Sequence, residues 1–149
     1  MEVLILAPEL RAQILREAKA AFPRECCGLI EGVRDRAVVR ATALYPARNL
    51  SPEADRFEID PADHFAALRA ARARGHDIVG CYHSHPGGKA EPSRRDADGA
   101  AERGFLWLIA AAASPVTAIL NAYVFDGEVF LAVSLHEAAS LDPARTPRL

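Results

Sequence analysis

The sequence is poor in cysteine and has no excess of charge of either sign. Its three cysteines, Cys26, Cys27 and Cys81, make an unsuitable disulfide framework because their number is odd and two are adjacent. We therefore expect free thiols in a reducing cytoplasm. The 18 basic and 20 acidic side chains give a net charge of −2, and no block of like charge occurs. This balance argues against a nucleic-acid partner.

The sequence also lacks the marks of export and of a membrane span. The first nine residues have no basic segment and only a short apolar run, which does not make a signal peptide. Residues 105–125 carry no charge and are long enough to cross a bilayer, but Ser114-Pro115 interrupts them. Strand-forming residues dominate this segment. We therefore predict two buried strands joined by a turn, and no membrane partner.

The hydrophobic content and the periodicity of the chain predict one domain over residues 1–149, with a frayed tail from about residue 142. Half of the residues are hydrophobic, which is enough for a real core. Hairpins are expected near both ends, the last at a two-residue Asp126-Gly127 turn. Helices are expected over 8–21, 61–74 and 93–103, and strands over 27–31, 37–45, 77–83, 105–111, 117–125 and 128–135. This mixture predicts an α/β (α+β) fold with a single mixed β-sheet and flanking helices.

The chemistry is concentrated in His83-Ser84-His85-Pro86 and in Asp96, eleven residues beyond His85. Two histidines at i and i+2 at a strand end point to the same face, so both can reach one ion. Two imidazoles and one carboxylate leave a fourth position of tetrahedral zinc open, which is typical of a catalytic site. Spacing alone leaves the ordinary interpretations open: isolated histidines, and a helix capping box from Ser93 to Asp96.

The joint pattern resembles the signature of the JAMM (MPN-domain) metalloproteases. That signature reads His-x-His-Pro, six residues, Ser, two residues, Asp, and the sequence matches it without a gap. An upstream segment of the family, Pro-x-Glu-x-Cys-Gly, matches the residues around Glu25. Asn49 and the Phe57-Glu58-Ile59-Asp60-Pro61 segment agree as well. The resemblance covers roughly residues 1–135, and it implies the MPN/JAMM fold, related to the cytidine-deaminase-like architecture.

The resemblance implies a role for each matched residue. His83, His85 and Asp96 would bind one Zn²⁺ per chain. Glu25 would act as general base and then pass its proton to the leaving amine. Ser93 would donate a hydrogen bond to the oxyanion.

Members of the family cut amide or isopeptide bonds after the C-terminal tail of ubiquitin-like proteins. The compact chain resembles the stand-alone bacterial type, which implies a sulfur-carrier protein with a Gly-Gly tail as substrate and partner. A homo-oligomer is compatible with this interpretation.

Three other classes of function share some of these sequence features. A non-catalytic MPN scaffold usually lacks the metal ligands, which are all present here. A cysteine hydrolase would use Cys26, Cys27 or Cys81 with a histidine, and a chelator would leave it active. A zinc nucleoside deaminase needs a Pro-Cys-x-x-Cys pair, which is absent. Asp98 could compete with Asp96 as a ligand, but it breaks the family spacing.

Overall fold

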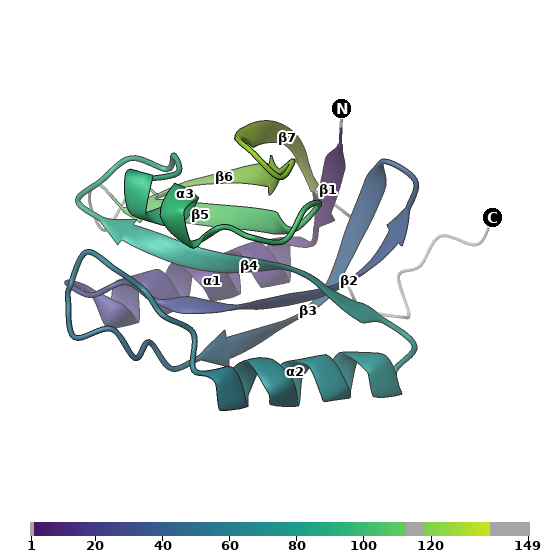
Figure 1. Ribbon diagram of the computed structural model, residues 1–149, viewed down its shortest axis with the longest axis horizontal. Helices are drawn as coiled ribbons and strands as arrows, with labels where there is room; N and C mark the ends of the chain where they lie inside the picture. Colours follow the sequence, from purple (N-terminus) through teal and green to yellow (C-terminus); the bar gives the residue numbers. More distant parts are fainter. Residues whose placement is uncertain (1, 113–117, 138–149) are drawn as a thin grey trace.

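One mixed β-sheet runs through the residues that the structure describes, 2–112 and 118–137 of a computed structural model (Figure 1). Its strands are β1 (Val3–Leu6), β2 (Cys27–Asp35), β3 (Val38–Ala47), β4 (Asp77–Pro86), β5 (Leu106–Ala112), β6 (Ala118–Phe125) and β7 (Phe130–Glu137). Their order is β1-β3-β2-β4-β5-β6-β7. Strand β1 is parallel to both β3 and β7, so the sheet closes on itself. Strands β4 and β5 are also parallel, and the other neighbours are antiparallel.

Two helices pack in separate apolar clusters. Helix α1 (Pro8–Ala21) inserts Leu10, Ile14 and Ala18 into a cluster to which every strand contributes. Helix α2 (Pro61–Ala73) adds Ala67 to a second cluster with Cys81 and other residues. Because neighbours along a strand alternate between faces, the two clusters lie on opposite sides of the sheet. Figure 1 shows α1 behind β4 and β2, with α2 below β3 in this view.

The helices begin where the local sequence favours it. Leu10, Ile14 and Ala18 are spaced four apart, so they form one buried stripe along α1. At α2 the side chain of Asp60 accepts a hydrogen bond from the Ala62 N–H at 2.9 Å, and proline occupies the first helical position. A third helix, α3 (Arg94–Gly99), has only six residues and follows β4.

The mixed α+β fold with a single mixed sheet and flanking helices is confirmed. The uncharged segment forms β5 and β6 rather than a membrane helix, as expected. Among the described residues, no helix has the length and apolarity needed to cross a membrane. The expected turn at Ser114-Pro115 and the tail from residue 142 lie outside the described residues.

Several expected boundaries were wrong. The N-terminal strand β1 was missed, because it is short and its partners are distant in sequence. Helix α3 ends at Gly99 rather than at residue 103. Strand β2 continues to Asp35, so its hairpin turns at Arg36, whose φ is 56°. The last hairpin turn is longer than two residues, because the Asp126 side chain accepts 2.8 Å bonds from two following backbone N–H groups.

Candidate metal centre

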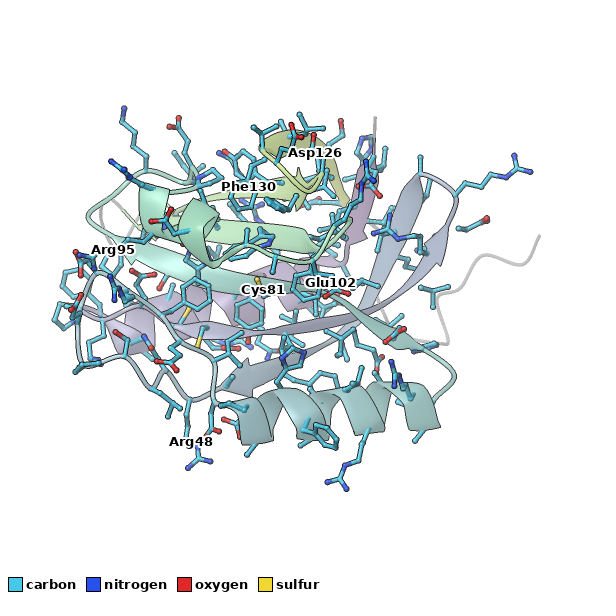
Figure 2. All side chains as sticks on the ribbon, in the orientation of Figure 1. Arg48, Cys81, Arg95, Glu102, Asp126 and Phe130 are labelled. Atoms are coloured by element: carbon cyan, nitrogen blue, oxygen red, sulfur yellow. The ribbon has the colours of Figure 1, made fainter. Side chains whose placement is uncertain are left out.

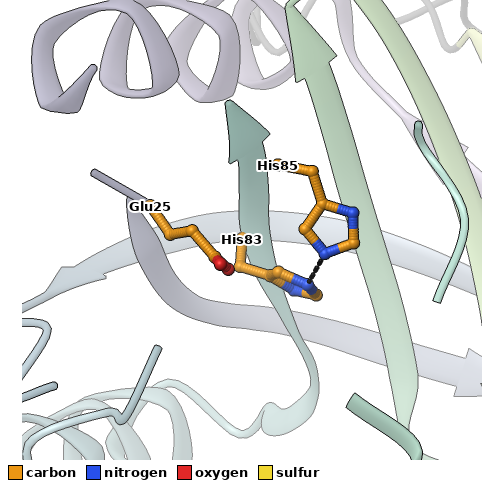
Figure 3. A group of neighbouring side chains, drawn as sticks. All are labelled: Glu25, His83 and His85. Atoms are coloured by element: carbon orange, nitrogen blue, oxygen red, sulfur yellow. Dashed lines mark hydrogen bonds between the residues drawn. The ribbon is translucent and has the colours of Figure 1, made fainter. Parts of the chain in front are cut away.

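Strand β4 carries both histidines, and strand β2 brings Glu25 beside them. Because β4 extends to Pro86, both His83 and His85 lie within it, on one face. Cys27 pairs with His83 in antiparallel register, which places Glu25, two residues earlier, level with His85. Figure 3 shows the Glu25 carboxylate directed towards the two imidazoles.

Ser84, between the histidines, fastens the backbone next to Glu25 to β4. Its buried hydroxyl oxygen accepts a hydrogen bond from the Cys26 N–H at 2.8 Å. The Ser84 N–H donates in return to the Cys26 carbonyl at 3.2 Å. These two bonds hold the segment that leads from Glu25 into β2 against the histidine-bearing strand.

Asp96 enters the site from the first turn of α3. The Ser93 hydroxyl oxygen accepts the Asp96 N–H at 3.0 Å, and Asp96 Oδ2 accepts the Ser93 N–H at 2.8 Å. This is the capping box that the sequence suggested. It directs the buried Asp96 carboxylate towards His83 and His85, while Asp98 stays exposed two residues later.

The three nearest donor atoms of the site fit one metal ion. His83 Nε2 lies 3.0 Å from His85 Nε2 and 3.2 Å from Asp96 Oδ2, and His85 Nε2 lies 3.1 Å from the same oxygen. Ligands of tetrahedral zinc at their usual bond lengths stand roughly 3.3 Å apart. Once both Nε2 atoms are deprotonated, their lone pairs converge with the Asp96 oxygen on the position of a shared cation. Ligand atoms of Glu25 and both histidines also lie within 4.8 Å of one another (Figure 3).

Different contacts orient the two imidazoles. His85 Nδ1 donates to the Lys89 carbonyl at 2.8 Å, which leaves Nε2 as the free donor for a metal. The fully buried His83 stacks on Phe57 with 4.2 Å between ring centroids and meets Trp107 edge-on at 5.8 Å. Its Nδ1 has no hydrogen-bond partner among the described residues. Aromatic packing thus fixes His83, whereas a backbone carbonyl fixes His85.

Different hydrogen-bond environments give the two buried carboxylates of the site opposite protonation behaviour. Glu25 is 5% exposed, and desolvation raises its pKa to about 7, although nearby His85 opposes the shift. Desolvation also acts to raise the pKa of Asp96, but hydrogen bonds from His83 and His85 outweigh it and hold that pKa well below its usual range. Glu25 can therefore exchange a proton near neutral pH, while Asp96 stays an anionic ligand.

The three cysteine thiols are free and buried, as expected. Desolvation raises the pKa of Cys26 to about 11 and that of Cys27 to about 12. Burial likewise raises the pKa of Cys81 well above its usual value. Because the thiolate is the nucleophile, these surroundings disfavour the cysteine-hydrolase interpretation.

Two cavities flank the site. A cleft of about 630 Å³ is lined by Glu25, His85 and Ser93, among others. A second cavity, of about 530 Å³, has Asp96 and aromatic side chains in its lining. Arg95 borders both and donates hydrogen bonds to Glu53 at 2.8 Å and Asp55 at 2.9 Å, which ties α3 to the loop before α2 (Figure 2).

Comparison with known proteins identifies the family. The family described as prokaryotic homologues of the JAB domain matches residues 7–124. This chain belongs to the prokaryotic JAB-domain family. The family match spans β2, β4 and α3 and so includes every residue expected at the site.

Curated relatives of this JAB-domain chain include a desampylase and a probable conjugate cleaving protease. A desampylase from Haloferax volcanii is 35% identical over 120 residues, which are 77% of this chain and 85% of that protein. A probable TtuB-protein conjugate cleaving protease from Thermus thermophilus is 37% identical over 92 residues, 61% of this chain and 56% of that protein. A protein from Desulfitobacterium hafniense has the same fold, with a TM-score of 0.87 at 25% identity, over 98% of this chain and all of that one.

The structure brings together all five residues that the sequence singled out, and it adds three contacts that the sequence did not indicate. The additions are the Ser84 hydroxyl, the Lys89 carbonyl and the stacking of Phe57 on His83. Ser84 could have been suspected from its place between the histidines. The Lys89 contact involves only a backbone atom, so no side-chain pattern could reveal it.

Proposed function

We propose that this JAB-domain chain is a zinc-dependent peptidase or isopeptidase. It hydrolyses an amide bond at the C-terminal tail of a ubiquitin-like or sulfur-carrier protein. The observation that carries the proposal is the convergence of His83 Nε2, His85 Nε2 and Asp96 Oδ2 within 3.2 Å of one another, beside a buried Glu25. Zinc suits a ligand set of two imidazoles and one carboxylate better than calcium or magnesium does.

In the proposed mechanism, one Zn²⁺ held by His83, His85 and Asp96 would acidify a water molecule and polarise the scissile carbonyl. Glu25 accepts the proton of the attacking water and delivers it to the leaving amine nitrogen, for which a pKa near 7 is well suited. The Ser93 oxygen accepts the Asp96 N–H, so its hydroxyl hydrogen stays free to donate to the developing oxyanion.

The proposed substrate follows from the relatives and from the cleft. Proteins named desampylase and conjugate cleaving protease share 35% and 37% identity with this chain. We propose that the tail ends in Gly-Gly, as the resemblance to the JAMM metalloproteases implies, and that it lies in the cleft lined by Glu25 and Ser93. The bond beyond the second glycine, to a lysine or to a short C-terminal extension, would be cleaved.

The proposal also includes the location, the domain organisation and the fold relationship of the protein. Free, buried thiols support a cytoplasmic location. We propose that residues 1–149 form one domain. We also propose that the fold is distantly related to the cytidine-deaminase-like architecture. A homo-oligomer is compatible with the proposed hydrolytic activity. A non-catalytic scaffold is disfavoured because it would have no need for three converging donor atoms beside a buried acid.

The first experiment is elemental analysis of the purified protein beside a His83→Ala/His85→Ala double variant. About one zinc per native chain, lost in the double variant, is the expected result. A native chain that contains no zinc and takes none up would favour the scaffold instead.

The second experiment is a cleavage assay with the zinc-loaded protein. Ubiquitin-like carriers that end in Gly-Gly, joined either to a lysine side chain or to a short peptide, are compared with carriers that end in Ala-Ala. Cleavage after Gly-Gly only is expected. Intact conjugates of both kinds would remove the proposed substrate class while leaving the metal site untouched.

A further inference from the structure

The loop of residues 87–92, between β4 and α3, bears on both ends of the metal centre. At its start the Lys89 carbonyl accepts the hydrogen bond that orients His85. At its end it leads into Ser93, which positions Asp96. The loop begins with two glycines, and Gly87 has a φ of 69°. Such a segment has few intrinsic restraints, so something outside it has to fix its course.

Ala90 is the buried anchor of this loop. It is 5% exposed, whereas Gly87, Gly88 and Lys89 before it are exposed. Its carbonyl oxygen accepts two hydrogen bonds, one from the Asn121 amide at 3.1 Å and one from the Tyr123 hydroxyl at 2.8 Å. Both acceptor positions of the oxygen are therefore used. The loop is therefore held by β6 as well as by β4, whose His85 imidazole bonds the Lys89 carbonyl and whose His85 carbonyl accepts the Gly88 N–H.

The two donors are well placed to act on the metal site from a distance. They are two residues apart along β6, so both side chains project from the same face of the sheet. Ile109 on β5 pairs with His83 on one side and with Asn121 on the other. Asn121 thus lies two strands away from His83 on the face that carries the histidines. The sheet fixes the position of β6 relative to β4. The hydrogen bonds from β6 to the Ala90 carbonyl therefore also fix the position of the loop relative to β4.

We infer that Asn121 and Tyr123 are positioning residues of the metal centre. By fixing the Ala90 carbonyl they fix the adjoining Lys89 peptide, whose carbonyl sets the rotation of the His85 imidazole. The same restraint holds the approach to Ser93 and hence the orientation of Asp96. Neither residue touches a donor atom of the site. The inference rests on the proposed zinc site, which it deepens by naming what holds the ligands in place.

The test compares single and double variants by metal binding. Tyr123→Phe removes one hydroxyl and keeps the ring in the apolar cluster around Trp107. Asn121→Ala removes the other donor. Tyr45→Phe is the matched control, because it also removes a hydroxyl from a tyrosine of that cluster. The Tyr45 hydroxyl donates to Glu31 and not to the loop. Zinc affinity is measured by competition with a chromophoric chelator, and Co²⁺ substitution reports ligand geometry through its visible bands.

We expect the Asn121→Ala/Tyr123→Phe double variant to bind zinc about tenfold more weakly, as is typical when the support of a metal ligand is lost. The Co²⁺ bands should weaken and shift, while Tyr45→Phe keeps the native spectrum and affinity. Thermal unfolding in excess chelator should show that the double variant is folded. Native affinity and an unchanged Co²⁺ spectrum in the double variant would overturn the inference.

The two proposals can fail separately. If the native chain binds zinc but cleaves no conjugate, the proposed function fails, and the positioning role is still measured by the affinities. If conjugates are cleaved and the double variant binds zinc like the native chain, the positioning role alone fails. A native chain that binds neither Zn²⁺ nor Co²⁺ would overturn both.

Discussion

At the scale of single residues, the site depends on two carboxylates with different surroundings. Asp96 receives hydrogen bonds from both histidines and from the Ser93 backbone, so it stays ionised. Glu25 is buried with no comparable partner set, and its pKa rises to about 7. Two acids of similar intrinsic strength are thus suited, through their environments alone, to the proposed roles of metal ligand and proton carrier.

Glu25→Gln should separate metal binding from chemistry. The amide has nearly the same shape but cannot accept a proton, so we expect zinc to be retained and kcat to fall by about 10²-fold or more. Zinc content and single-turnover cleavage are measured together. Glu102→Gln, an exposed acid that lines neither cavity of the site, is the control and should retain turnover. Unchanged turnover in Glu25→Gln would remove Glu25 from the mechanism.

At the scale of elements, the short helix α3 owes its stability to its cap. Six residues make too few hydrogen bonds for a helix to be stable on its own. The reciprocal bonds between Ser93 and Asp96 satisfy the first N–H groups and at the same time orient a metal ligand. One residue pair therefore serves the fold and the site together.

Ser93→Ala should weaken both functions of this cap. Losing the N-cap oxygen typically costs about 1 kcal/mol, and a looser Asp96 should lower zinc affinity. Turnover should fall as well, because the hydroxyl donor to the oxyanion is gone. Urea unfolding, zinc competition and kcat are compared with those of Ser93→Thr, which retains a capping hydroxyl. If zinc affinity in Ser93→Ala equals that of the native chain, the cap does not position Asp96.

Strand β4 shows the limit of element prediction at the site. The sequence indicated a strand that ended at His83, with His85 in the turn. Pairing with β5 continues to Pro86 on one side, so both histidines are held in regular structure. This extension comes from backbone bonds to a strand more than twenty residues later in the sequence. Local patterns carry no information about such a partner.

At the scale of the whole molecule, a buried carboxylate on β2 joins segments that are far apart in the sequence. Glu31 is fully buried and accepts hydrogen bonds from Thr42 and from the Tyr45 hydroxyl at 2.8 Å. His76 Nδ1 lies 3.0 Å away and the Arg74 guanidinium 3.6 Å. The sequence did not indicate this network.

The network predicts a pH dependence of stability. Desolvation acts to raise the pKa of Glu31, but the bonds from Thr42, His76 and Tyr45 outweigh it, so that pKa is lowered from 4.5. A lowered folded-state pKa adds stability above the unfolded value, and that stability is lost as the pH falls through the folded value. Urea unfolding from pH 7 to pH 3 should therefore show a steeper loss below about pH 4.5 in the native chain than in Glu31→Gln.

A matched surface change makes this test specific. Glu128→Gln alters an exposed acid in the last hairpin turn and should leave the native pH profile in place. Equal slopes for the native chain and Glu31→Gln below pH 4.5 would show that the network does not hold Glu31 in its charged form.

The sequence by itself selected the side chains that we propose as the metal donors and the proton carrier. His83, His85 and Asp96 were selected by their spacing together with the resemblance to the JAMM metalloproteases, and Glu25 was selected by that resemblance. Spacing alone left isolated histidines and a plain capping box open. Helix α1 and strands β5 and β6 were equally predictable, since all three depend on local periodicity.

Only the tertiary structure decided how these side chains are brought together and held. Register between β2 and β4 places Glu25 level with His85, and closure of the sheet needs β1, whose four residues carry no distinctive pattern. The supports of the site are a hydroxyl on Ser84, a carbonyl at Lys89 and donors on β6. They act through backbone atoms and through strands distant in sequence. The residue types therefore indicated the chemistry of the site. The relative positions of these side chains depend on strand pairings that exist only once the sheet has closed.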